Sequence, residues 1–272
     1  MVEITEKEFQ QLANFMKSHY GINLKEEKRY LVIGRLQHVL AEKQIGSFSK
    51  YFDYVTSDNT GNAVATLVNR LTTNHTFFLR EAEHFDYFKN HVLPILSTCQ
   101  APSKDLRIWS AGCSTGEEPY TLAMIVSDYF GIEKGGWDAQ ILATDISSGV
   151  LEKAIAGVYH VDQIANVPVN WKNKYFKPVD RERMAVVERI KSEVIFRRFN
   201  LMNAHFPFKK KFHVIFCRNV MIYFDVETRQ RLVEKFYEHT EPGGYLFIGH
   251  SESLNRKQTK YDYIMPAVYR KG

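Results

Sequence analysis

The sequence predicts an α/β protein in which a Rossmann-like parallel sheet follows an all-helical amino-terminal part. Up to about residue 98, apolar residues recur at helical spacing and no segment has a convincing strand pattern. After the linker-like stretch 100–104, short apolar strands alternate with helices, which is typical of a parallel sheet. We therefore expect a helical domain over 1–98, which includes the start of a ligand cleft, and a second domain over 99–272.

The first helix is marked by its ends. Thr5 and Glu8 have the spacing of a capping box, and Gly21 is a plausible stop. Between them, apolar residues fall on one helical face. Further helices are expected over 25–41, 48–55, 63–71 and 83–96.

The strands of the predicted sheet are short apolar runs. They are expected at Leu106–Ser110, Ala139–Thr144, Val194–Phe196, Phe212–Cys217, Tyr245–Ile248 and Ala267–Tyr269. Residues 160–193 interrupt the alternation of strands and helices, and Met184–Ile190 could add strands there. We therefore expect a small β-subdomain inserted at about 160–193.

Composition and charge set the class of protein. The chain has 272 residues, 44% hydrophobic and 25% charged, as in a soluble globular protein. A net charge of +5 suits an acidic partner, and equally an ordinary solvated surface. The three cysteines have no metal-ligand spacing and fit a reducing compartment, so no metal is expected. Because neither a signal peptide nor an apolar run of membrane-spanning length is visible, we expect a cytoplasmic protein without membrane insertion.

The first strand of the sheet leads into a loop with Gly112 and Gly116, followed by Glu117 and Glu118. A helix dipole stabilises two such carboxylates even without a ligand. They would nevertheless repel a diphosphate and attract an ammonium or sulfonium group. Asp145 ends the second strand, where Rossmann-like sites place an acid on ribose hydroxyls, although it could also cap the helix from Ser147 onward. Together these acids indicate S-adenosylmethionine more than a dinucleotide.

Two further polar clusters are candidates for the same site. Arg218, Asn219 and Tyr223 follow the strand that ends at Cys217, and ligands bind at the carboxyl ends of parallel strands. Ahead of the sheet, the segment 71–81 surrounds two phenylalanines with Asn74, Thr76 and Arg80; the alternative is a buried loop with satisfied caps. No base that could activate Cys217 is apparent, so we expect it to be a packing residue.

Taken together, these motifs resemble the CheR family of chemotaxis receptor methyltransferases. The matching blocks are Leu71–Glu81, Ser110–Tyr120, Ala143–Ile146, Asn200-Leu201, Phe216–Phe224 and Gly249–Glu252. The resemblance implies a helical amino-terminal domain, a Rossmann-like methyltransferase domain and an inserted β-subdomain. It also implies a protein-glutamate O-methyltransferase, which transfers methyl from S-adenosylmethionine to the cytoplasmic helical bundle of chemoreceptors and leaves S-adenosylhomocysteine.

The resemblance assigns roles to residues at matching motif positions. Glu118 would bind the methionine end of the cofactor, with Glu117 as the neighbouring alternative, and Asp145 would bind the ribose. Arg80 and Tyr223 would orient the substrate carboxylate. Asn74, Thr76 and Arg80 would line the cofactor and catalytic cleft. Asn200 and Leu201 would flank the adenine, and Arg218 and Asn219 would complete the site.

Two departures from the enteric pattern of the family concern receptor recognition. The second helix has fewer arginines than enteric members carry, so docking would use Lys25, Lys28, Arg29, Arg35 and Lys43 or other surfaces. The stretch 176–184 has no glycine and is about three residues shorter than the loop of members that tether to a receptor's carboxyl-terminal pentapeptide. We therefore expect recognition without that tether.

Two alternative functions fit parts of the sequence. A methyltransferase acting on RNA or a small molecule would tolerate the basic charge, but no dense Lys/Arg stripe interleaved with aromatics is visible, and we expect no nucleic-acid partner. A non-catalytic module that senses S-adenosylmethionine would not need Arg80 and Tyr223, and both are present. Nothing in the sequence demands assembly, so we expect a monomer.

Overall fold

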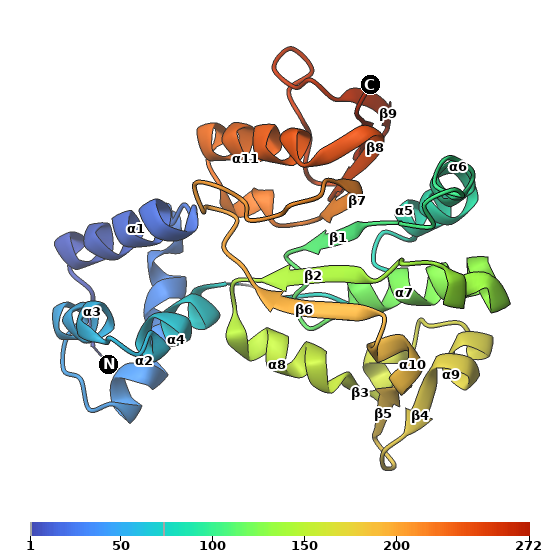
Figure 1. The fold of residues 1–272 in the computed structure, drawn as a ribbon. Helices are drawn as coiled ribbons and strands as arrows, with labels where there is room; N and C mark the ends of the chain where they lie inside the picture. The colour runs from blue at the N-terminus through green and yellow to red at the C-terminus, as the bar shows by residue number, and fades with distance from the viewer. Residues whose placement is uncertain (1, 73) are drawn as a thin grey trace.

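A computed structural model describes residues 2–72 and 74–272 of the chain. The amino-terminal part is a cluster of helices beside the sheet (Figure 1). It contains α1 (Glu6–Tyr20), the 3₁₀ turn η1 (Glu26–Lys28), α2 (Arg29–Glu42), α3 (Phe48–Ser57) and α4 (Asn62–Leu71).

The predicted caps of α1 are confirmed. The Thr5 hydroxyl accepts a hydrogen bond from the Glu8 amide, and the Glu8 carboxylate accepts one from the Thr5 amide. Gly21 ends the helix with a φ of 70°, a left-handed conformation that glycine adopts without a steric penalty. The helix expected over 25–41 is present as η1 and α2; α2 buries Val32, Leu36, Val39 and Leu40, whereas Tyr30 is 85% exposed.

The helix predicted over 83–96 is present as one run with a wider turn in its middle. It consists of α5 (Ala82–Tyr87), the π-helical turn η2 (Phe88–Val92) and α6 (Leu93–Cys99). Its buried face, which includes Phe85 and Phe88, packs in the same core as strand residues Val214 and Phe216.

The second part of the chain forms a seven-stranded sheet in the order β6-β2-β1-β7-β8-β10-β9. Its strands are β1 (Ile108–Ala111), β2 (Ile141–Asp145), β6 (Val194–Arg198), β7 (Phe212–Cys217), β8 (Thr240–Ile248), β9 (Asp262–Met265) and β10 (Val268–Arg270). β6, β2, β1, β7 and β8 are parallel, whereas β10 and β9 are antiparallel to their neighbours. The expected Rossmann-like sheet is confirmed. Strand β9 was not predicted: its apolar run is only three residues long, Tyr263–Met265, and Tyr263 and Ile264 are exposed.

Two cores cover the two faces of the sheet. On β1, Ile108 belongs to the core formed with α5, α6, α7 (Glu117–Phe130) and α8 (Ser148–Ala156). The next residue, Trp109, belongs to the core formed with α11 (Val226–Glu238) and the helices of the amino-terminal part. This alternation follows from the two-residue period of a strand. The helical domain therefore shares one continuous core with the sheet.

The inserted β-subdomain has its own three-stranded antiparallel sheet in the order β3-β5-β4. It comprises β3 (Val158–His160), the 3₁₀ turn η4 (Val161–Ile164), α9 (Val169–Tyr175), β4 (Phe176–Pro178), β5 (Arg183–Val186) and α10 (Glu188–Lys191). The expectation of strand structure through Ile190 is wrong beyond Val186, because a helical turn at 188–191 buries Ile190 in the core. The domain limits 1–98 and 99–272 remain predictions.

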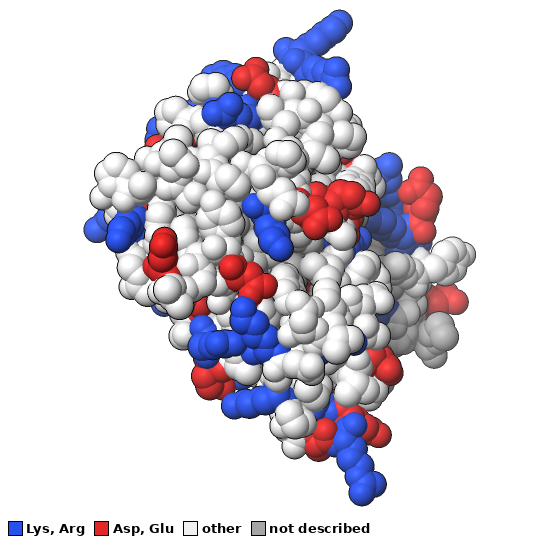
Figure 2. Space-filling model, turned by 90° about the vertical axis from the view of Figure 1, so that its right-hand side faces the viewer, with Lys and Arg blue, Asp and Glu red and all other residues white. Residues whose placement is uncertain are grey.

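Charge is distributed rather than concentrated on the face that Figure 2 shows. There, Lys and Arg alternate with Asp and Glu among many uncharged side chains, without a continuous basic stripe among the described residues. None of the helices in the described ranges combines the length and the apolar character needed to cross a membrane.

Candidate active site

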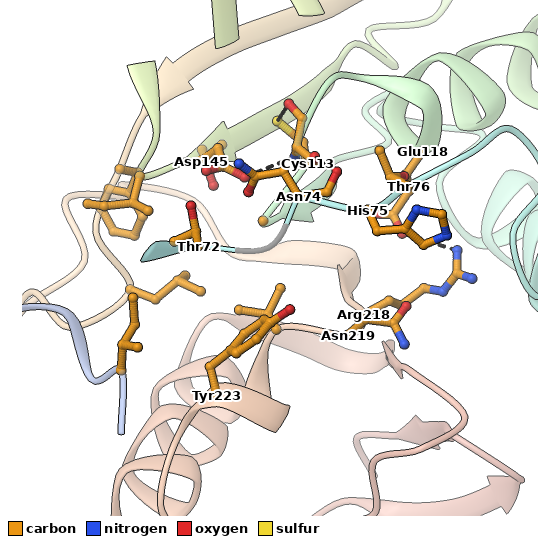
Figure 3. Close-up of a pocket in the computed structure, with 18 of the residues that line it drawn as sticks. Thr72, Asn74, His75, Thr76, Cys113, Glu118, Asp145, Arg218, Asn219 and Tyr223 are labelled. Carbon is orange, nitrogen blue, oxygen red and sulfur yellow. Dashed lines mark hydrogen bonds and ion pairs between the residues drawn. The ribbon is translucent and has the colours of Figure 1, made fainter. Parts of the chain in front are cut away.

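A cavity lies at the carboxyl edge of the sheet, where β1 separates the strands that run outward in the two directions. Counting its open mouth, it encloses about 1020 Å³, which is large enough for a nucleotide-sized ligand. Its walls come from the end of β2, from the loops after β1, β6 and β7, from residues 74–80 and from the end of α1. All the side chains predicted for the site line this cavity, and Figure 3 labels most of them.

The loop between β1 and α7 brings the backbone close to the cavity. Gly112 has a φ of 88°, and a Cβ there would collide with a methyl group of Val220. A larger residue would push the loops after β1 and β7 apart. The next turn aims the Ser114 amide at the Asp145 carboxylate, with an N–O distance of 2.9 Å.

Asp145, at the end of β2, uses its two oxygens on opposite sides. One accepts the Ser114 amide, and the other accepts the Ser147 amide at 2.9 Å. Ser147 itself caps α8 through its hydroxyl, so Asp145 supports the helix start without being the cap. Burial raises the pKa of Asp145, and these amide hydrogen bonds partly offset the increase. The carboxylate is thus held rigidly at the cavity wall.

The two adjacent glutamates, Glu117 and Glu118, lie in different environments. Glu118 lines the cavity, where it accepts a hydrogen bond from the Ser110 hydroxyl at 2.7 Å and pairs with Arg218 at 3.1 Å. Glu117 is 1% exposed and does not line the cavity; one oxygen accepts the Thr115 hydroxyl, and the other has no hydrogen-bond partner among the described residues. Burial raises the pKa of both carboxyls. Of the two alternatives, only Glu118 is placed to contact a ligand.

Arg218 is a buried cation shared by two acids. Its side chain is 3% exposed, and it contacts Glu118 and Glu81 at 3.1 Å each. It also donates to the Arg80 carbonyl and lies over the Phe85 ring, 5.0 Å from the centroid. Because removing a charge from water is costly without partners, both acids are needed to hold Arg218 here. The segment that carries Arg80 and Glu81 is thereby anchored to the end of β7.

The role of Glu81 was missed by the sequence reasoning, although it ends one of the blocks on which the family resemblance rests. Its second oxygen accepts hydrogen bonds from the Asn219 side chain and the His250 amide, both at 3.2 Å. Arg218 and these donors lower the pKa of Glu81 against the opposing effect of burial. A signal was available in the Arg-Glu pair at 80–81, but nothing local indicates a partner 137 residues away.

A second buried acid supports Asn219. The Glu252 carboxylate accepts hydrogen bonds from the amides of Asn219 at 3.0 Å, Ile222 at 3.1 Å and Gly249 at 2.6 Å. Asn219 has a left-handed φ of 58°, which asparagine tolerates better than most residues. These contacts fix the loop that carries Asn219 and Tyr223.

Arg80 and Tyr223 both line the cavity. The Arg80 guanidinium donates to the His75 carbonyl at 2.7 Å and lies 5.9 Å from the centroid of the Phe77 ring. In Figure 3, Tyr223 lies across the cavity from Asp145 and Asn74. A cation and a phenol on the walls of one cavity supply the two kinds of donor that can hold a carboxylate.

Glu81, His84 and His250 have ligand atoms within 4.8 Å of one another, a spacing that a metal ion would accept. Arg218 already neutralises Glu81, however, and a divalent cation would have to displace that guanidinium. His84 is fully buried, and burial together with Arg218 lowers its pKa to about 4, so the imidazole is neutral. The cluster is best described as part of the charge network that anchors Arg218.

The fold and site together define an S-adenosylmethionine-dependent methyltransferase. The residues fit such a cofactor, because the backbone comes close at Gly112 and the carboxylates of Glu118 and Asp145 line the same cavity. The models of the CheR methyltransferase family match two parts of the chain, the all-alpha domain at residues 7–72 and the SAM binding domain at residues 74–269. The chain belongs to this family, which confirms the assignment made from the sequence motifs.

Curated relatives agree over nearly the full length. The chain is 42% identical over 274 residues to the chemotaxis protein methyltransferase of Borreliella burgdorferi, covering 100% of this chain and 96% of the relative. It is 33% identical over 270 residues to that of Escherichia coli, covering 98% and 91%. Among solved structures, the glycopeptide N-methyltransferase MtfA complexed with S-adenosylmethionine is 15% identical, with a TM-score of 0.31 over 53% of this chain and 46% of that one. The protein is thus a methyltransferase of chemotaxis.

Proposed function

We propose that this enzyme methylates glutamate side chains on the cytoplasmic helical bundle of chemoreceptors and forms glutamyl methyl esters. The observation that carries the proposal is that Arg80 and Tyr223 line the same cavity as the carboxylates of Glu118 and Asp145. The two carboxylates suit the cofactor, and the cation with the phenol suits a carboxylate substrate. In the family resemblance these two residues occupy the positions that orient the substrate.

The chemistry requires alignment more than a strong base. A glutamate carboxylate, with a pKa of about 4.3, is already ionised at neutral pH. When bound, S-adenosylmethionine supplies an electrophilic methyl group on sulfur. Arg80 would hold one oxygen of the substrate carboxylate while Tyr223 donates a hydrogen bond, so that the other oxygen faces the methyl group. Such positioning supplies several kcal/mol, up to ~7–11 in ideal cases.

The cysteines near the site are unsuited to a covalent mechanism. Cys217 is fully buried and does not line the cavity, whereas Cys113 lines it but is 1% exposed. Burial raises the pKa of both thiols, and nearby carboxylates raise them further. Because the thiolate is the reactive form of cysteine, neither is activated as a nucleophile.

For the cofactor, we propose that Glu118 receives the ammonium group and Asp145 the ribose hydroxyls. Leu201, which is nearly buried and lines the cavity, would pack against the adenine. Asn74 and Thr76 supply polar atoms from the segment opposite Tyr223. These roles follow the family resemblance and agree with the side chains that the cavity exposes.

Intramolecular contacts already engage some of the basic residues that were expected to dock on the receptor. Arg29 is engaged with Glu6, Glu26 and the Ile4 carbonyl. Arg35 donates to the carbonyls of Leu71 and Thr72, and Lys28 lies over the Tyr223 ring. Lys25 and Lys43 are exposed, as is Tyr30 at 85%. We propose that these exposed side chains, rather than the arginines, contact the receptor.

We also propose that recognition does not use a carboxyl-terminal pentapeptide. The turn between β4 and β5 is closed by a hydrogen bond from the Val179 amide to the Arg183 carbonyl at 2.9 Å. Asp180 tightens it further by accepting the amides of Glu182 and Arg183. A turn closed in this way has no glycine-containing loop against which a peptide could bind. Micromolar binding of a receptor's terminal pentapeptide, measured by calorimetry, would contradict this part of the proposal.

The activity is tested by transfer of labelled methyl from S-adenosylmethionine to purified chemoreceptor cytoplasmic fragments, followed by mild base. Label released as methanol identifies a carboxyl methyl ester. Arg80→Ala should abolish the release, and Arg181→Ala, an exposed arginine on the β-subdomain turn, should leave it unchanged. Label that survives base would refute glutamate methylation. Cofactor binding without transfer to any receptor fragment would favour a sensing module instead.

A further inference from the structure

The segment that joins α1 to η1 forms one wall of the cofactor cavity. We call residues 20–25 the α1 loop; Tyr20 and Ile22 within it line the cavity together with Leu201 and Asp145. The loop follows α1 in the cluster of helices (Figure 1), whereas most of the other lining residues belong to the sheet and its loops. The cavity is therefore incomplete without the helical domain.

Gly21 is the point of closest approach between this loop and the segment after β6. It has a φ of 70°, and a Cβ there would lie 2.5 Å from the Met202 sulfur and 3.1 Å from its Cγ. Real Cβ atoms do not approach other atoms this closely, so a side chain at position 21 would have to displace Met202. Only glycine permits both the backbone conformation and the contact.

Met202 is tied to the residues proposed to lie beside the adenine. Its amide donates to the Asn200 side-chain oxygen at 2.9 Å, and the Asn200 side-chain nitrogen donates to the His19 carbonyl at 2.8 Å. The Asn200 side chain thus bridges its own turn and the end of α1. Because both ends of the amide are engaged, Asn200 acts by holding the turn in place, and Leu201 is the residue that this turn presents to the cavity.

The same loop also holds the segment that carries Tyr223. The Asn23 amide donates to the Tyr223 carbonyl at 2.8 Å. Tyr223 ends the 3₁₀ turn η5 (Met221–Tyr223), and Asp225, just beyond it, pairs with Lys17 of α1 at 2.8 Å. The α1 loop, with the last turns of α1, therefore contacts both the Asn200–Met202 turn and the segment of Tyr223.

From these contacts we propose that the α1 loop is a positioning element of the cofactor site, and that Gly21 acts through Met202 to set cofactor affinity. A side chain at position 21 would displace the Met202 side chain, and we infer that this displacement disturbs the Asn200–Met202 turn in the free protein. The cofactor would then have to restore the turn on binding, which weakens affinity. The inference rests on the proposed placement of the adenine beside Leu201.

The test compares Gly21→Ala with Gly61→Ala by calorimetric titration with S-adenosylhomocysteine. Gly61 has nearly the same left-handed φ of 74°, but no atom lies within 4 Å of the place that a Cβ would take, so the control carries the backbone strain without the contact. We expect Kd to rise about tenfold or more for Gly21→Ala and less than about twofold for Gly61→Ala. Equal Kd values for the two variants would overturn the proposal.

A double variant separates positioning from general destabilisation. Gly21→Ala combined with Met202→Ala removes the clash and keeps the strain, so it should bind S-adenosylhomocysteine more tightly than Gly21→Ala alone. If the double variant binds as weakly as the single one, the contact with Met202 is not the cause. Leu201→Ala tests the adenine placement separately, because normal affinity in that variant would refute the placement whatever Gly21→Ala does.

Discussion

Replacing Arg218 with methionine should destabilise the fold strongly, because it removes the positive charge that two buried acids share. Arg218 is 3% exposed, and Glu81 and Glu118 are each 13% exposed. Methionine has a similar length and keeps the contact with the Phe85 ring, so the change in packing is small. What is lost is the compensation of the two carboxylates.

The expected cost follows from the burial of the pair. Removing one partner of a buried ion pair costs about 3–5 kcal/mol, since the remaining charges stay desolvated. For a chain of this size, such a loss lowers Tm by roughly 6–15 °C. Protonation limits the cost, because the orphaned carboxyls acquire raised pKa values in the folded state. The folded variant then binds more protons than its unfolded chain, and its deficit relative to the wild type should shrink as pH falls from 7 toward about 5.

The measurement is thermal unfolding of both proteins between pH 5 and 8, with Arg231→Met as the matched control. Arg231 also pairs with a glutamate, Glu227, at 2.6 Å, but their side chains are 59% and 78% exposed. An exposed pair of this kind contributes less than about 1 kcal/mol. If Arg218→Met and Arg231→Met lose similar stability, or if the deficit of Arg218→Met does not depend on pH, the reasoning from burial is refuted.

Three further outcomes are expected. Burial raises the pKa of Glu118, and only the ionised carboxylate attracts an ammonium group. Titration calorimetry should therefore show the affinity for S-adenosylhomocysteine falling as pH is lowered from 7 toward about 5. Glu118→Gln should bind weakly at every pH, and a wild-type affinity that does not change with pH would contradict the role of Glu118. Cys217→Ala should keep methyl transfer within about twofold while lowering stability by about 1 kcal/mol, and loss of transfer in a folded variant would restore Cys217 as a catalytic candidate. Lys17 and the Thr228 amide lower the pKa of Asp225 in the folded protein. The Asp225 carboxylate therefore stabilises the fold above its unfolded-state pKa of about 3.9, and this stabilisation is lost as pH falls through the lower folded-state pKa. The difference in stability between the wild type and Asp225→Asn should shrink below about pH 4, and a constant difference would show that the carboxylate charge does not contribute.

The parts of the fold that local chemistry specifies can be predicted from the sequence. The capping box at Thr5 and Glu8 and the stop at Gly21 depend on residues that are near neighbours in the chain. The parallel strands are recognisable because a strand buried on both faces is a continuous apolar run, as in Phe212–Cys217. Polar residues directly after such strands indicate the site, because parallel strands end at the same edge.

Other features depend on contacts that no local pattern encodes. Strand β9 lies at the edge of the sheet and is mostly exposed, so only the short run Tyr263–Met265 marks a strand whose place is decided by pairing with β10. The choice between Glu117 and Glu118 depends on which face of α7 is turned toward the cavity. One residue of rotation sends Glu117 into the protein beside Thr115 and sends Glu118 to Arg218.

The sequence by itself determined the chemistry of this protein: which polar groups follow which strands, and therefore the kind of cofactor and reaction that they serve. The tertiary structure alone decided how these groups are held. The pair of Glu81 with Arg218 and the contact of Gly21 with Met202 join residues more than a hundred positions apart. Such contacts form when the helices of the amino-terminal part pack against the sheet in a common core. The spacing of residues in the sequence does not predict them.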